Sequence, residues 1–163
     1  MAEDTIEVLV EIPRGSRNKY EYDSERGYFR LDRTLYSSVH YPGDYGFIPE
    51  TLADDGDELD ALVLVEEPTF PGCHVRARPI GVMRMKDDKG IDDKIICVSL
   101  ADPRLAEIYD FSDIARHWQR EIEHFFSIYK ELQDLRVEMR GWGDRATAWE
   151  IIEAARAAAP AHH

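Results

Sequence analysis

The chain has 163 residues, of which 44% are hydrophobic, and its 33 acidic and 20 basic residues give a formal net charge of −13. This length suits one domain, predicted over residues 1–163, with enough apolar residues to bury a substantial core. The acidic balance excludes a typical nucleic-acid-binding protein, because such proteins need a positive face for the phosphate backbone. The first residues, "MAEDTIEVLVEIP", contain neither a basic leader nor an apolar span, which predicts a cytoplasmic protein without a membrane segment.

Short runs with the pattern of strands fill the first two thirds of the chain, with Pro, Gly and Asp between them. Alternation of apolar and polar residues is typical of strands, because successive side chains point to opposite faces. The predicted strands are Thr5–Ile12, Lys19–Asp23, Tyr28–Asp32, Ala61–Val65, Gly72–Met85 and Lys94–Leu100. Their number and spacing predict a small barrel or a strongly bent sheet.

The hydrophobic period changes in the last third of the chain. In "FSDIARHWQREIEHFFSIYKEL", residues 111–132, apolar residues recur at intervals of three and four, as on one face of an amphipathic helix. We expect Ser112 or Asp110 to cap this helix. A second helix is predicted from near Asp144 to Pro160, which ends it. Strands first and helices last predict an α+β, mainly β, fold in which the helices pack outside a barrel.

The two cysteines, Cys73 and Cys97, lie far apart and lack a C-x-x-C spacing. They are predicted to be small buried hydrophobic residues rather than a disulfide or a metal site.

Two loops rich in acids each precede an apolar strand. "DDGDELD", residues 54–60, contains Asp55, Asp57 and Asp60, and "MKDDKGIDDK", residues 85–94, contains Asp87 and Asp92. If the two strands belong to one barrel, these carboxylates converge at its rim, and convergent oxygens suit a hard cation such as Mg²⁺. The alternative is that both loops are solvated turns, in which Asp and Gly are common.

Basic and aromatic residues accompany the acids. Lys19 and Glu21 share a strand face, Arg33 ends a predicted strand, Tyr41 and Tyr45 lie around the turn "YPGDYG", and Tyr129 and Lys130 lie near the end of the long helix. Lysine and arginine bind phosphate, and phenols can donate a hydrogen bond to it. Each residue alone also fits an ordinary role as a solvated charge or a packed aromatic ring.

Six segments together resemble a known family. "EIPRGSRNKYE", "LDR", "YPGDYGFI", "DGDELDALVL", "MKDDKGIDDK" and "HFFSIYKEL" have the order and spacing found in the soluble family I inorganic pyrophosphatases, over about residues 5–135. The chain departs from the family pattern at Glu58, where proline is usual. The resemblance implies an OB-type five-stranded barrel with flanking strands and helices. It also implies hydrolysis of pyrophosphate to two phosphates with several Mg²⁺ ions, for which Mn²⁺ or Zn²⁺ could substitute. Bacterial relatives form homohexamers, so we expect one here.

The resemblance also implies roles for individual residues. The metal ligands would be Asp55, Asp60 and Asp92, with Asp60 shared between two ions, joined by Asp87 and Glu11. The phosphate contacts would be Lys19, Arg33, Tyr45, Tyr129 and Lys130, supported by Glu21, Tyr41 and Lys94. Asp57 would accept a proton from the attacking water, a role for which Asp92 is the competing candidate. No covalent intermediate is expected.

Two other functions fit part of the pattern. A metal-dependent phosphohydrolase acting on nucleotides would share the carboxylates and cations, but it would need an apolar slot for the base and sugar. An acidic OB-type module that binds Ca²⁺ or a protein would bind metal without releasing phosphate. Measurement of phosphate release from pyrophosphate and from ATP distinguishes both alternatives from a pyrophosphatase.

Overall fold

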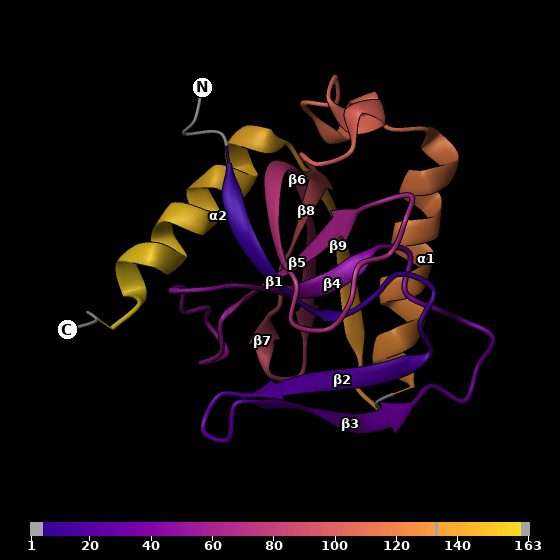
Figure 1. Cartoon of the computed structure of the whole chain (residues 1–163), viewed down its shortest axis with the longest axis vertical. Helices are drawn as coiled ribbons and strands as arrows, with labels where there is room; N and C mark the ends of the chain where they lie inside the picture. Colours follow the sequence, from indigo (N-terminus) through magenta and orange to yellow (C-terminus); the bar gives the residue numbers. More distant parts are fainter. Residues whose placement is uncertain (1–4, 133, 161–163) are drawn as a thin grey trace.

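A closed barrel of five strands forms the centre of the protein (Figure 1). The computed structural model describes residues 5–132 and 134–160. Around the barrel the strands follow the order β1 (Ile6–Ile12), β4 (Asp44–Ile48), β5 (Leu59–Leu64), β8 (Lys94–Ser99) and β6 (His74–Asp87). Pairing of β1 with β6 closes the ring. The predicted α+β, mainly β class with a small five-stranded barrel is thereby confirmed.

Strand pairing within the barrel places the two acid-rich loops side by side. β5 and β8, which follow those loops, are neighbours and run parallel, so both strands begin at the same rim. The other pairings in the ring are antiparallel. Gly46 allows β4 to approach β1 closely, because a Cβ at this position would lie 1.9 Å from the carbonyl oxygen of Leu9.

Strands outside the ring complete the β structure. β7 (Gly90–Ile91) and β9 (Val137–Gly143) both pair with β6. β2 (Asn18–Asp23) and β3 (Tyr28–Thr34) form a separate two-stranded hairpin beside the barrel (Figure 1). Of these elements, β4, β7 and β9 have no counterpart among the strands predicted from the sequence. The turn expected at "YPGDYG" is a bend at Pro42 and Gly43, and Tyr45 already lies in β4.

The long helix begins later than predicted. α1 spans Arg116–Glu131, whereas Phe111–Asp113 form a 3₁₀ turn, and a second such turn spans Pro103–Leu105. The side chain of Asp110 caps the 3₁₀ turn, and the N-cap of α1 is Ala115, which makes no side-chain cap. The prediction that Ser112 or Asp110 caps the long helix is therefore wrong. The extended backbone of Ile114 separates the two elements and lets its side chain reach the core.

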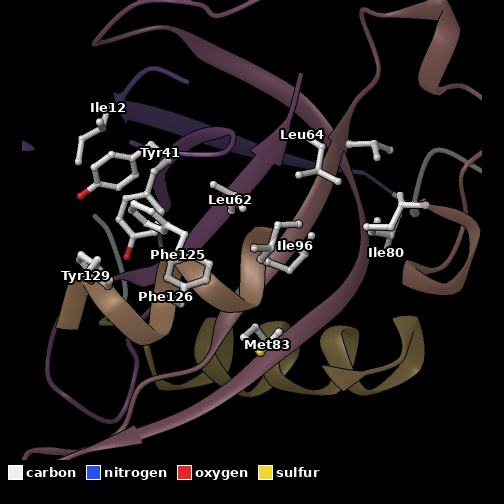
Figure 2. Packing of buried hydrophobic residues seen from close by; sticks show 14 of the residues in the cluster. Ile12, Tyr41, Leu62, Leu64, Ile80, Met83, Ile96, Phe125, Phe126 and Tyr129 are labelled. Atoms are coloured by element: carbon white, nitrogen blue, oxygen red, sulfur yellow. The ribbon is translucent and has the colours of Figure 1, made fainter. Parts of the chain in front are cut away.

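Both helices pack against the outside of the barrel. α1 buries Ile122, Phe125, Phe126 and Tyr129 against one set of barrel residues (Figure 2). α2 (Arg145–Ala158) buries Ala148, Ile152 and Ala155 against another set. As predicted, α2 follows Asp144, whose side chain accepts a hydrogen bond from the backbone N–H of Thr147. The packing of α1 also brings Tyr129 and Lys130 to the barrel rim.

The remaining sequence predictions concern cysteines and membranes. Both cysteines are free thiols, and Cys97 is buried in the barrel as predicted, but Cys73 is only half-buried. Within the described ranges, no helix is long and apolar enough to cross a membrane.

Candidate active site

A cavity of about 1060 Å³ lies between the barrel rim and the β2–β3 hairpin. All but two of the residues predicted for the site line it. They are Glu11, Lys19, Glu21, Tyr45, Asp55, Asp57, Asp60, Asp87, Asp92, Lys94, Tyr129 and Lys130. These residues come from β1, β2, β4, β5, β6, β8, α1 and the two acid-rich loops. The fold therefore brings together residues that lie as far apart in sequence as Glu11 and Lys130.

Lys94 is a buried cation between two of the carboxylates. Its Nζ donates to Asp60 Oδ2 at 2.7 Å, to Asp92 Oδ1 at 3.1 Å and to the hydroxyl of Tyr45 at 2.8 Å. Only 1% of the side chain is exposed. All three N–H donors of the ammonium group are thus used, which satisfies a charge whose burial would otherwise be costly.

Lys130 repeats this arrangement from α1. Its Nζ lies 3.1 Å from Asp87 Oδ2 and 2.5 Å from Asp92 Oδ2. Asp92 therefore has one oxygen on each lysine. The repulsion expected within the acidic cluster is offset here by two ammonium groups, because opposite charges at these distances attract strongly in a partly desolvated site.

These contacts shift the pKa values of the buried acids in different directions. Burial would raise the pKa of Asp92, but Lys94 and Lys130 outweigh it and hold the pKa below the ordinary value. Burial raises the pKa of Asp60, and Lys94 only partly opposes it. Burial would lower the pKa of Lys94, but the neighbouring acids Asp60 and Asp92 raise it well above its ordinary value.

Asp55 and Asp57 lie in an exposed turn at the mouth of the cavity. Asp55 Oδ1 accepts the backbone N–H of Asp57 at 3.0 Å, and Gly56 between them has φ of +90°. Such a left-handed conformation favours glycine, which explains its place inside the acidic run. Neither carboxylate forms an ion pair with another described residue. Unlike the acids deeper in the cavity, these two side chains are open to an incoming ligand.

Glu11 contributes a protonatable carboxyl group on β1. Its Oε2 accepts the backbone N–H of Tyr22 at 3.0 Å, which joins the hairpin to the barrel. Burial raises the pKa of Glu11 to about 7, assisted by repulsion from Asp60, Glu21 and Glu58 and opposed by the hydrogen bond from Tyr22. At neutral pH, this carboxyl group is poised between its two protonation states.

This shift predicts a pH dependence of stability. The folded-state pKa of about 7 lies above the ordinary 4.5. The stabilisation that Glu11 contributes to the folded state is therefore fully present below pH 4.5 and is lost as pH rises through 7. In a chelator, the unfolding free energy of the native protein relative to Glu11→Gln should fall by about 3 kcal/mol across this range. Urea unfolding of both proteins at several pH values measures it. A constant difference would contradict the assignment.

Two predicted site residues do not line the cavity. Arg33 is exposed on β3, where its Nε donates to Asp32 Oδ2 at 3.1 Å. Tyr41 is 1% exposed, and its ring packs 4.6 Å from that of Phe125, measured between centroids (Figure 2). Its buried hydroxyl has no hydrogen-bond partner among the described residues. Tyr41 is therefore a core residue behind the cavity rather than a wall of it.

The carboxylates of the cavity do not form a complete metal site in the chain alone. Among the described residues, no three His, Cys, Asp or Glu side chains are grouped closely enough to hold an ion. Lys94 and Lys130 lie between the acids and keep them apart. The oxygen donors nevertheless have the chemistry that Mg²⁺ prefers.

Two acids near this cavity, Glu58 and Asp32, have no role predicted from the sequence. Glu58 lines it, and partial burial together with repulsion from Asp57 and Asp60 raises the pKa of its carboxyl group. Asp32 contacts both Lys19 and Arg33. The signal for Asp32 is its place beside Arg33 in "LDR", but only the structure shows that its carboxylate also reaches Lys19 on the other strand.

Comparison with known proteins gives a consistent result. The family model described as "Inorganic pyrophosphatase" matches residues 8–159. An inorganic pyrophosphatase of Methanosarcina mazei is 52% identical over 157 residues, covering 96% of this chain and 93% of the relative. One of Synechocystis is 51% identical over 148 residues, covering 91% of this chain and 88% of the relative. The crystal structure of the inorganic pyrophosphatase from Thermus thermophilus aligns with a TM-score of 0.91 at 46% identity, covering 94% of this chain and 90% of that one.

Proposed function

Because the chain belongs to the inorganic pyrophosphatase family, a family of hydrolases, we propose that it hydrolyses inorganic pyrophosphate to two phosphate ions with Mg²⁺. Water attacks phosphorus directly, without a covalent intermediate. The observation that carries this proposal is the cavity in which Lys94 and Lys130 alternate with Asp60, Asp87 and Asp92. Carboxylate oxygens for cations thus stand beside Lys130, whose ammonium group can also donate to phosphate, and phosphoryl transfer depends on such positioned charges.

The donor set fits Mg²⁺. The residues that would hold it are Asp55, Asp60 and Asp92, together with Asp87 and Glu11. Magnesium, when bound, neutralises charge on the substrate and makes water a better nucleophile near neutral pH. The raised pKa values of Glu11 and Asp60 support this assignment, because they mark carboxyl groups that the chain's own cations do not fully neutralise. Mn²⁺ or Zn²⁺ would offer the same charge to these oxygens.

The cations and phenols of the cavity would bind the two phosphoryl groups. Lys19, Lys130, Tyr45 and Tyr129 line the wall, and Arg33 would reach in from the hairpin. Lys94 has no unused N–H, so its contribution is to fix Asp60, Asp92 and Tyr45 in place. Glu21, with one oxygen 3.6 Å from Lys19 Nζ, would support these contacts, whereas the buried Tyr41 would act only through its packing.

Asp57 is the better candidate for the proton acceptor. Its carboxylate is open to the cavity mouth and free of cations within the described chain, so a water molecule can reach it. Asp92 has both oxygens on ammonium groups, and its lowered pKa makes it a weaker base. We therefore assign to Asp57 the removal of a proton from the attacking water, which requires hydrogen-bond reach as well as a suitable pKa.

Arg33→Ala should lower kcat/KM for pyrophosphate on the order of 10- to 100-fold, the effect of losing a charge-assisted hydrogen bond to phosphate. Its affinity for Mg²⁺ without substrate should stay near that of the native protein, because Arg33 contacts no proposed metal ligand. Steady-state kinetics and a metal titration measure the two quantities. Arg30→Ala, an exposed arginine of the same strand, is the control. A large loss of resting Mg²⁺ affinity would overturn the assignment.

Phosphate release from pyrophosphate and from ATP, each with Mg²⁺, tests the substrate class. The cavity should favour pyrophosphate by a wide margin, since its polar groups converge on phosphoryl oxygens. Faster release from ATP would indicate the nucleotide phosphohydrolase instead. Metal binding that raises stability without any phosphate release would indicate the non-enzymatic module.

The domain organisation, the assembly and the location of the protein are also proposals or predictions. We propose that residues 1–163 form one domain, because the family match spans the barrel and both helices. The homohexamer and the cytoplasmic location stay predictions from the resemblance and the sequence. Sedimentation equilibrium that finds a stable monomer would contradict the hexamer.

A further inference from the structure

The β2–β3 hairpin carries an irregularity next to the cavity. Lys19 pairs with Arg33 across the hairpin, but the next pair is Tyr20 with Leu31. The register thus shifts by one residue, and Asp32 has no partner on β2. An extra residue of this kind is a β-bulge, which re-aims side chains and is common beside active sites.

One carboxylate oxygen of Asp32 serves two cations. Oδ2 lies 3.1 Å from Arg33 Nε and 3.5 Å from Lys19 Nζ. Lys19 and Arg33 are directly opposite in register, and like charges in that position destabilise a hairpin. Asp32 offsets this repulsion, and the Lys19 side chain that it contacts is only 19% exposed. The bulge therefore lets Arg33, which does not line the cavity, stand beside Lys19, which does.

The contact with Asp32 uses only Nε of Arg33 and leaves its two Nη groups available for a ligand. Arg33 donates through Nε, and neither of its Nη groups donates to another described residue. These terminal groups form the planar fork that binds phosphate oxygens in pairs. A guanidinium held by Nε loses less conformational freedom when phosphate binds, and so does a lysine already directed into the cavity.

We propose that Asp32 is a positioning residue, which holds Lys19 and Arg33 ready for the two phosphoryl groups without itself touching the substrate. The proposal rests on the proposed function, since it takes both cations to bind phosphate. Charge and positioning predict opposite effects of removing Asp32 on anion binding. By charge alone, removing an acid near an anion site strengthens anion binding. Loss of positioning weakens it.

The experiment compares Asp32→Asn with the native protein. Calorimetry with Mg²⁺ and methylenediphosphonate, which water does not cleave, measures affinity without turnover. We expect Kd for the diphosphonate and KM for pyrophosphate to rise on the order of 3- to 10-fold, while kcat stays within about twofold. Asp32→Glu, which keeps the carboxylate, should recover most of the affinity. In the Arg33→Ala background, Asp32→Asn should raise Kd and KM by a smaller factor than it does in the native protein.

Asp23→Asn is the matched control, because it removes the same charge from the opposite end of the hairpin, where Asp23 pairs with Arg26. It should leave the diphosphonate affinity unchanged. Unchanged or tighter binding by Asp32→Asn, or equal weakening by Asp23→Asn, would overturn the proposal. Native protein that binds the diphosphonate but does not cleave pyrophosphate would refute the proposed function alone. Native protein that does not bind the diphosphonate would refute both.

Discussion

Asp57→Asn is expected to lower kcat for pyrophosphate on the order of 10² to 10⁴-fold, the usual contribution of a general base. Asparagine keeps the shape of the side chain but cannot accept a proton from water. The activity optimum should move to higher pH, where hydroxide forms without help. Affinity for Mg²⁺ in the absence of substrate should stay near native, since Asp57 is not assigned as a ligand. A metal titration and a pH–rate profile measure these effects.

Two further variants separate the role of Asp57 from the charge of its loop. Asp54→Asn removes the same charge from the same exposed loop, but Asp54 does not line the cavity, so its kinetics should be near native. Asp60→Asn should weaken Mg²⁺ binding first, and excess Mg²⁺ should restore part of its rate. If Asp57→Asn keeps the native pH profile, or behaves as Asp60→Asn does, Asp92 becomes the candidate base.

Lys94→Met is expected to lower the free energy of unfolding by about 3–5 kcal/mol at pH 7 in a chelator, the cost of leaving a buried charge unpaired. Methionine fills much of the volume but leaves Asp60 and Asp92 without the cation that they share. The loss should shrink as pH falls, because protonation removes the unpaired charges. Urea unfolding at pH 7 and at lower pH measures both effects.

A divalent cation should reverse part of this loss, because it supplies positive charge to the same oxygens and stabilises the state that binds it. Lys86→Met, an exposed lysine on β6, is the control and should change the unfolding free energy little. Lys94→Arg keeps the charge and tests the geometry. An unfolding free energy of Lys94→Met equal to that of the native protein would show that Lys94 does not neutralise these acids.

Local patterns predicted most of the fold. β1, β5, β6 and β8 follow alternating or continuously apolar runs, and α2 follows its cap and its apolar period. β4 was missed because Pro42 and Gly43 indicate a turn immediately before it. β9 contains two glycines and is held in place by its pairing with β6, which no local pattern reveals. Closure of the barrel through β1 and β6 is likewise a long-range pairing.

The cavity was predictable in composition but not in its internal contacts. Nearly all of the site residues that the resemblance implied do line it, yet spacing could not show that Lys94 and Lys130 bond to Asp60, Asp87 and Asp92. Those contacts depend on the parallel pairing of β5 with β8 and on the packing of α1. A one-residue register shift in a hairpin, such as the one at Asp32, also has no clear sequence signal.

Pyrophosphate hydrolysis by metal-stripped protein, followed through a Mg²⁺ titration, tests the central claim most directly. We predict almost no phosphate release in the chelator and a saturable rise with Mg²⁺, with two phosphates formed for each pyrophosphate consumed. Phosphate release at the same rate without any divalent cation, or none at any Mg²⁺ concentration from folded protein, would contradict the account.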